Sequence, residues 1–213
     1  MKKRRSNPVS VVLLWAGGLL LLAALLLTLR NLGEENQAAR QAEDSLQQII
    51  AQLPEPSQEE AGSAGPLIPE MVPEEDTPAD AAELPTVTVN GAEYIGTLSL
   101  PALGLTLPIL RDWSDQLLKL APCRYQGSVQ TGDMLLVAHN YRLHFGRLKN
   151  LSPGDSVTFT DVNGTVFDYA VSGVKQFDTP DMEEIKAGEW DLMLFTCTID
   201  GAGRIAAYCD REE

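Results

Sequence analysis

The residues from Thr86 to Glu213 predict an all-β domain, preceded by an apolar helix and an acidic linker. Short stretches of alternating apolar residues recur throughout this part of the chain. Turn signals such as Asn90-Gly91 and Asn163-Gly164 separate them. About seven or eight such strands fit into roughly 128 residues, and strands of this length and spacing favour a closed barrel or a sandwich.

Charge and cysteine content restrict the function. The net charge is −14 over 213 residues, so the chain lacks the basic excess that nucleic-acid binding by phosphate neutralisation requires. Acidic residues are concentrated between Asn31 and Pro85, where the chain contains 13 Asp and Glu residues and one Arg. Three cysteines form neither a disulfide framework nor a zinc-binding spacing. We therefore expect no nucleic-acid partner and no structural zinc.

The N-terminus predicts a membrane anchor. Four basic residues, Lys2 to Arg5, precede an uncharged run from Val9 to Leu29, and about 20 apolar residues suffice to cross a bilayer. A cleaved signal peptide is the alternative, but its apolar region is shorter, and no small-residue cleavage pattern precedes Arg30. Because basic flanks stay in the cytoplasm, residues 1–30 are expected to be a cytoplasmic tip and a single-pass anchor of the cell membrane, with the remainder extracellular.

Residues 31–85 are expected to connect the anchor to the folded domain, residues 86–213. From Glu34 to Leu53, apolar residues recur at near-helical spacing, which predicts a juxtamembrane helix. From Pro54 to Pro85, the chain alternates Pro, Glu, Ala and Ser. Such a segment has little to bury and repels itself, so we expect a disordered, extended spacer.

The elements of the C-terminal domain follow from the same patterns. Thr86 to Leu110 predicts strands with turns, Ser114 to Leu120 a short helix, and Gly132 to His139 a buried strand. His144 to Phe177 predicts a short helix and two strands joined at Asn163-Gly164. A polar excursion with a helical turn near Pro180 then precedes the last two strands, Asp191 to Cys197 and Gly203 to Cys209.

Three side chains whose chemistry suits nucleophilic attack on an amide lie at the ends of predicted strands. His139 ends "MLLVA", Cys197 ends "LMLFT", and Arg204 begins "IAAYC". Each residue alone is more often structural, but neighbouring strand ends gather at one rim of a barrel. A nearby imidazolium favours a thiolate nucleophile, and a guanidinium offers donors to a developing oxyanion. Together the three residues predict a site for attack on an amide.

The local sequences around these residues resemble the sortases, membrane-anchored cysteine transpeptidases of Gram-positive cell surfaces. The matching stretches are "IGTLSLPALGLTLPIL", "LLVAHNYRLHFGRLKNLSPGDSVTF" and "LMLFTCTIDGAGRI". The resemblance covers roughly Ala92 to Asp210. It implies an eight-stranded β-barrel that cleaves an LPxTG-like sorting signal of a surface protein and forms a thioacyl enzyme. An amine of a peptidoglycan precursor or a pilin would then accept the acyl group.

The resemblance also implies residue roles. Cys197 would be the nucleophile, His139 the acid and base, and Arg204 the oxyanion and substrate clamp. Substrate binding would fall to three neighbours, Thr196, Asn140 and Leu194. Met193 stands where the family commonly has Thr, and the step from Cys197 to Arg204 is only seven positions (204 − 197), which implies a tight final loop. Residues 174–190 are expected to read the sorting motif.

Several of these assignments have alternatives. His144 lies five positions after His139 and is the second candidate for the base. Cys123 and Cys209 are interpreted as packing residues, with a disulfide as the alternative. No cofactor is expected. Calcium is a candidate only at an acidic cluster, for which a solvated loop is the simpler interpretation; the cluster comprises Asp178, Asp181, Glu183 and Glu184.

Two other functions compete with transpeptidation. The same three residues would serve a surface cysteine peptidase that only hydrolyses, and an added amine distinguishes the two. A catalytically silent, tethered binding module is the non-enzymatic alternative. The presence of Cys197, His139 and Arg204 in one chain argues against it.

Overall fold

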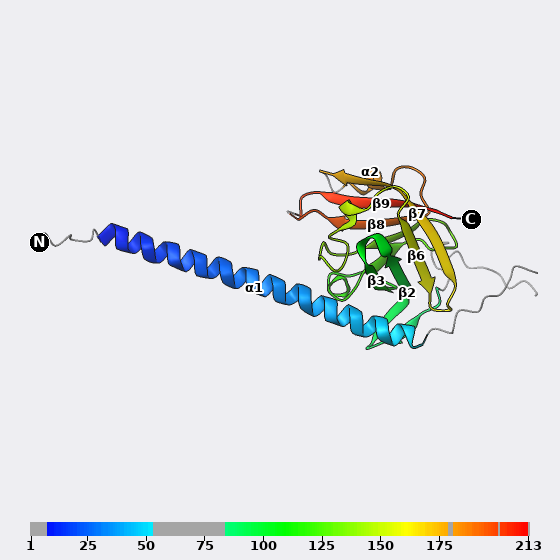
Figure 1. Ribbon diagram of the computed structural model, residues 1–213, viewed down its shortest axis with the longest axis horizontal. Coiled ribbons are helices and arrows are strands. Elements are labelled where there is room, and N and C mark those ends of the chain that lie inside the picture. Colours follow the sequence, from blue (N-terminus) through cyan, green and yellow to red (C-terminus); the bar gives the residue numbers. More distant parts are fainter. Residues whose placement is uncertain (1–7, 53–83, 179–180, 200, 213) are drawn as a thin grey trace, which may run out of the picture.

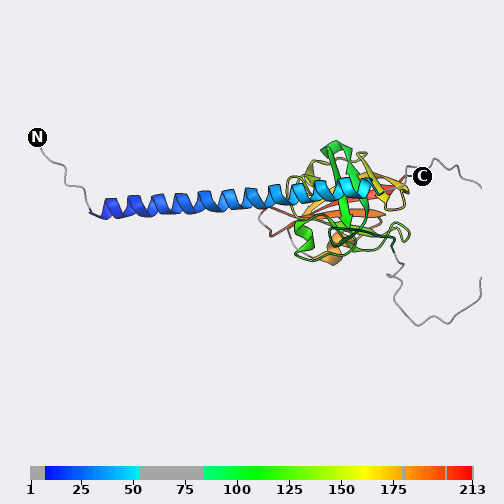
Figure 2. The ribbon, with the colours of Figure 1, turned by 90° about the horizontal axis from the view of Figure 1, so that it is seen from below.

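In the computed structural model, a long N-terminal helix leads to a β domain (Figures 1 and 2). The structure describes residues 8–52, 84–178, 181–199 and 201–212. Helix α1 (Pro8–Ile50) runs through both the apolar stretch and the predicted juxtamembrane helix without a break. Within the described part of the chain, no helical stretch is both long enough and apolar enough to cross a bilayer. Most of the predicted spacer, residues 54–83, lies outside the described residues.

The described part of the β domain contains nine strands in one sheet. Their order is β1-β2-β3-β4-β5-β8-β9-β7-β6, and β2 also pairs with β6. This extra pairing closes β2 to β9 into an eight-stranded barrel, with β1 added at its edge, so the predicted barrel is confirmed. The strands are β1 (Val87–Val89), β2 (Ala92–Leu100), β3 (Leu105–Leu110), β4 (Cys123–Gln126), β5 (Met134–Val137), β6 (Ser156–Asp161), β7 (Val166–Phe177), β8 (Leu192–Cys197) and β9 (Arg204–Arg211).

Short helices connect the strands. They are η2 (Pro101–Leu103), η3 (Leu117–Lys119), η4 (Leu148–Asn150) and α2 (Met182–Lys186). Three of them lie where the sequence predicts a helix or helical turn, whereas η2 lies where a turn is predicted. Both predicted Asn-Gly turns are confirmed. Asn90 and Gly91 adopt φ angles of 51° and 81° between β1 and β2, and Gly164 adopts 85° between β6 and β7. Asn and Gly tolerate positive φ better than other residues, which explains why these dipeptides mark the hairpins.

Alternation along the strands separates an inner core from an outer apolar cluster. Inward residues such as Leu136, Leu194 and Ala207 join the large barrel core. Their neighbours on the other face form the cluster under α2, which comprises Leu135, Ile185, Met193, Phe195, Ala206 and Tyr208. The outer face of β5, β8 and β9 is therefore apolar and covered by the β7–β8 connection, instead of being solvated.

The C-terminal part of α1 packs against the β domain. Four residues at helical spacing, Ala42, Ser45, Leu46 and Ile49, are at most 6% exposed. The buried Tyr94 hydroxyl donates a hydrogen bond of 3.0 Å to Ser45 Oγ. The sequence predicts a helix here, but the structure shows that its apolar face is covered by the chain's own β1, β2 and β3.

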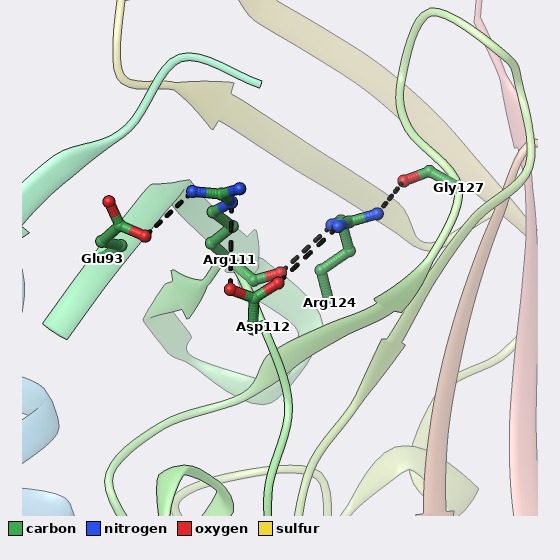
Figure 3. A network of polar contacts seen from close by, with 5 residues as sticks. All are labelled: Glu93, Arg111, Asp112, Arg124 and Gly127. Atoms are coloured by element: carbon green, nitrogen blue, oxygen red, sulfur yellow. Dashed lines mark hydrogen bonds and ion pairs between the residues drawn. The ribbon is translucent and has the colours of Figure 1, made fainter. Parts of the chain in front are cut away.

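Two arginines hold the segment between β3 and β4 in place (Figure 3). Arg124 Nε donates to the Arg111 carbonyl at 3.1 Å, and its Nη1 donates to the Gly127 carbonyl at 3.1 Å. Arg111 pairs with Glu93 at 3.0 Å, and Asp112 lies within 4.0 Å of both guanidinium groups. These contacts fix both ends of the segment that carries η3.

Candidate active site

Cys197 and Arg204 are brought together by the last hairpin. They are paired residues at the loop end of the antiparallel strands β8 and β9. Directly opposite residues in such a pair project to the same side of the sheet. Both side chains are half-buried. The tight loop that the spacing predicts is therefore confirmed, and it places the guanidinium on the same face as the thiol.

The loop between these strands is held by Thr198 and Gly203. Thr198 N donates to the Gly203 carbonyl at 3.0 Å, and Gly203 N donates to Thr198 Oγ1 at 2.9 Å. A Cβ atom on residue 203 would lie 2.4 Å from the Phe177 carbonyl oxygen, so this position requires glycine. Arg204 Nη1 donates to the carbonyls of Gly201 and Gly203, at 3.0 and 2.8 Å. The loop thus fixes one end of the guanidinium.

His139 joins the site through a parallel strand pair. β5 runs parallel to β8 with Val137 opposite Phe195. Beyond β5, Ala138 N donates to the Phe195 carbonyl at 3.1 Å, and Asn140 Nδ2 donates to the Thr198 carbonyl at 3.1 Å. These two contacts bracket His139 and place it beside Cys197, 58 positions away in sequence (197 − 139).

Side-chain parity puts the three residues on one face. Cys197 follows Met193 and Phe195 in alternation, Arg204 precedes Ala206 and Tyr208, and His139 follows Leu135 and Val137. The buried members of these three rows belong to the outer apolar cluster under α2. His139, Cys197 and Arg204 therefore continue that outer surface at the loop end of β8 and β9. The sequence predicts convergence at a barrel rim, and the structure adds that the shared surface is the outer face.

The other predicted site residues lie differently. Leu194 and Thr196 are both 0% exposed and belong to the inward row of β8, and Thr196 Oγ1 donates to the Ala138 carbonyl at 2.8 Å. Their side chains face away from the surface that carries Cys197, so their geometry suits positioning of β5 against β8. Asn140 is half-buried and links the loop after His139 to the Cys197 strand.

Electrostatics favour a neutral His139. Burial lowers the pKa of His139 below its ordinary value of 6.5, and the positive charge of Lys119 lowers it further, while Asp115 acts in the opposite direction. Both charged residues belong to the segment around η3, which the arginine contacts of Figure 3 hold in place. Within the described part of the chain, His139 Nε2 is buried without a hydrogen-bond partner. The ring is therefore mainly an uncharged base at neutral pH.

His144, the alternative base, is enclosed. It is 0% exposed, and neither ring nitrogen has a hydrogen-bond partner among the described residues. Burial, with a smaller contribution from His139, lowers the pKa of His144 to about 4. The Tyr141 ring is close to both histidines, with centroid distances of 5.0 Å to His139 and 5.4 Å to His144. Of the two rings, only His139 lies on the surface that carries Cys197.

The remaining cysteines are buried thiols. Cys123 and Cys209 are 0% exposed, and all three cysteines are free, so the alternative of a disulfide is wrong for this structure. Burial raises the pKa of both thiols to about 12, which removes them as nucleophiles. Cys197 is the accessible thiol of the three.

The connection between β7 and β8 is docked on the barrel. Ile185 of α2 is 0% exposed, and its carbonyl accepts a 2.7 Å hydrogen bond from the Tyr208 hydroxyl. Lys186 Nζ donates to Gln126 Oε1 at 2.6 Å. Asp181 caps α2 by accepting from Glu183 N at 3.0 Å. Among the residues that the structure describes, no group of three or more His, Cys, Asp or Glu is arranged to hold a metal ion.

Sequence reasoning missed three features near the site. Ile199 lies just after β8, the strand that carries Cys197, and is 90% exposed. Leu143 lies in the loop after His139 and is 42% exposed. Exposed apolar side chains in loops carry no periodic signal, so the sequence alone does not distinguish them from core residues. Lys119 and Asp115 act on His139 through space, and only the fold shows that proximity.

Comparison with known proteins agrees with this geometry. Residues 98–212 match the family model of the sortase domain. Sortase A from Bacillus anthracis is 30% identical over 125 residues, which cover 55% of this chain and 59% of that relative. The matched region thus spans about three fifths of the relative's length.

Solved structures support the same fold. Sortase A from Corynebacterium diphtheriae matches with a TM-score of 0.51 and 19% identity, covering 57% of this chain and 62% of that chain. Sortase C1 from Streptococcus agalactiae matches with a TM-score of 0.51 and 23% identity, covering 59% and 71%. At these identities the structures show the fold alone, whereas the family model covers more than half of the chain. The chain therefore belongs to the sortase family.

Proposed function

We propose that this chain is a cysteine transpeptidase that cleaves an LPxTG-like sorting signal and transfers the surface protein to an amine. The proposal is supported by the strand register, which pairs Cys197 with Arg204 and places Val137 opposite Phe195, two residues before His139 and Cys197 respectively. A thiol, a base and a fixed guanidinium form a complete set for acyl transfer from an amide. Membership of the sortase family supports this assignment.

The proposed mechanism begins with proton transfer from the Cys197 thiol to neutral His139. The thiolate attacks the scissile carbonyl carbon, and the carbonyl π electrons move to the oxygen, which accepts hydrogen bonds from Arg204. The intermediate then collapses. The C–N bond breaks, the imidazolium protonates the leaving amine, and a thioester to Cys197 remains. An incoming amine attacks this thioester and loses a proton to His139. The C–S bond breaks, and the departing thiolate takes that proton from the imidazolium, which restores the thiol and the neutral His139.

Arg204 suits the oxyanion role for a geometric reason. Its guanidinium always carries a charge, and the loop carbonyls of Gly201 and Gly203 fix it before substrate arrives. A donor held in advance costs little reorganisation when negative charge develops. The docked connection between β7 and β8 covers the neighbouring part of the same face, so residues 174–190 are proposed to read the sorting motif. The accepting amine is proposed to belong to a peptidoglycan precursor or a pilin.

Localisation at the cell membrane is part of the proposal. Sortases are typically membrane-associated, and the uncharged run from Val9 to Leu29 follows four basic residues. Within this run, the structure describes the side chains from Trp15 to Leu29. Trp15 is 78% exposed, and eight leucines from Leu19 to Leu29 are more than half exposed. Such a surface is costly in water and suits lipid, so we assign residues 1–30 to a single-pass anchor, residues 31–85 to the connection and residues 86–213 to the catalytic domain.

Incubation of the purified chain with sorting-signal peptides and candidate amines tests this function. Mass spectrometry should detect a thioester adduct on Cys197 and, with amine present, a ligated product. Cys197→Ala should abolish both. Free acid alone, unaffected by amine, would identify a hydrolase instead. Absence of any adduct across a diverse peptide library would favour a tethered binding module.

A further inference from the structure

The arrangement of α1 against the β domain has a consequence for the direction in which the site faces. Ala42, Ser45, Leu46 and Ile49 are buried, and Ile49 lies in one cluster with Tyr94 and Leu110. The helix is unbroken from Pro8 to Ile50. An unbroken helix packed by four consecutive contact positions acts as a strut, so the orientation of the domain is set by the helix and not by the residues that follow it.

Two cavities define which end of the domain lies along which part of α1. Leu120, next to η3, lines one cavity together with Gln41, Asp44 and Ser45. Val162 and Asn163, in the β6–β7 turn, line another with Ile49 and Gln52. The η3 segment, whose charges act on His139, therefore lies nearer the N-terminal end of α1 than the β6–β7 turn does.

The ribbon views agree with these cavities. In Figures 1 and 2 the turn between β8 and β9 points toward the N-terminal end of α1, whereas the other end of β9 lies on the opposite side. This turn contains Ile199, which is 90% exposed, and it adjoins both Cys197 and Arg204. The thiol end of the domain thus faces the part of the helix that carries the exposed leucines.

We propose that α1 holds the Cys197 end of the domain toward the bilayer, so that the thiol is presented at a set height above the lipid headgroups. This inference rests on the proposed anchor and transfer activity. The docked segment begins at Gln41, eleven residues after Arg30 (41 − 30), and a helical rise of about 1.5 Å per residue makes this distance about 17 Å. The β8–β9 turn extends on the bilayer side, so the accepting amine and the scissile bond are reached close to the lipid headgroups.

Energy transfer to headgroup-linked acceptors tests the orientation in full-length protein reconstituted into vesicles. One fluorophore is attached to Ile199→Cys and, in a matched variant, to Asn163→Cys, both in a Cys197→Ala background. Both positions are exposed, and Cys123 and Cys209 are buried, so labelling is selective. Energy transfer from the fluorophore at position 199 should exceed that from the fluorophore at position 163 roughly twofold or more, because opposite ends of a small domain lie about 30 Å apart. Equal transfer, or greater transfer from position 163, would overturn the proposal.

Insertion of residues into α1 provides a second test of the orientation. Seven Ala-rich residues placed after Asn36 should raise the domain by about 10 Å with only about 20° of net rotation. Energy transfer from both labels should then fall. In the unlabelled chain with Cys197 in place, the same insertion should lower acylation of a vesicle-bound amine several-fold and leave acylation of a soluble amine unchanged. Unchanged transfer from both labels would show that α1 is no strut.

The outcomes separate this inference from the proposed function. Flotation with the vesicles tests the anchor, and its failure removes the anchor and the orientation together. Loss of peptide acylation with unequal energy transfer would refute the transpeptidase while leaving the orientation intact. Normal acylation with equal energy transfer would refute the orientation alone.

Discussion

Replacing His144 by phenylalanine should remove a large part of the acid sensitivity of this protein. His144 is 0% exposed, and neither ring nitrogen has a partner within the described residues. Its pKa of about 4 in the folded chain lies below the ordinary 6.5 because burial opposes the charged form. The unfolded chain therefore binds a proton between pH 6.5 and pH 4 that the folded chain does not bind, and stability falls as pH falls through this window.

The size of the effect follows from the two pKa values. The difference between 6.5 and about 4, at about 1.36 kcal/mol per pKa unit, gives a full effect of about 3 kcal/mol. Between pH 7 and pH 4.5, most of this is lost, about 2 kcal/mol. Phenylalanine has a similar shape and no titrating group. It also removes an unpartnered buried donor, so its stability at pH 7 should equal or exceed that of the wild type by about 1 kcal/mol.

Urea unfolding of the detergent-solubilised chain at pH 7 and pH 4.5 measures this difference. The wild type should lose about 2 kcal/mol more than His144→Phe on acidification. His139→Phe is the matched control, since it leaves the contribution of His144 in place. If both variants and the wild type lose the same stability, His144 is partnered or solvated in solution, and the reasoning from its burial is wrong.

Three further changes have expected outcomes. Lys119→Gln should raise the pKa of His139 and shift the acid limb of the activity profile to higher pH, and Asp115→Asn should shift it to lower pH; identical profiles would show that neither charge acts on the ring. Ile49→Ala should cost about 3 kcal/mol of unfolding free energy in urea, because it truncates a fully buried side chain, and a loss below about 0.5 kcal/mol would indicate that α1 is not docked. Gly203→Ala should lower kcat/KM at least about tenfold with intact circular dichroism, because a Cβ there meets the Phe177 carbonyl at 2.4 Å; normal activity would mean that the β8–β9 loop need not keep this shape.

Local pattern accounts for much of the fold and part of the site. Alternating apolar residues and Asn-Gly dipeptides act over a few neighbours, so the strands and the hairpins at Asn90 and Asn163 follow from the sequence. Cys197 and Arg204 are separated by one tight loop, and their pairing across β8 and β9 follows from the same local logic. The helical spacing of Ala42, Leu46 and Ile49 likewise predicts a helix with one apolar face.

Long-range packing decided the rest. Pairing between β5 and β8 joins residues 58 positions apart, and no local pattern states which strands become neighbours or which face they share. The tertiary structure therefore placed His139 beside Cys197, turned Leu194 and Thr196 inward, and covered the apolar face of α1 with the chain's own β domain. Burial lowers the pKa values of both histidines. The burial of a side chain depends on every residue packed around it, including residues far away in the sequence, so the local sequence does not predict these shifts.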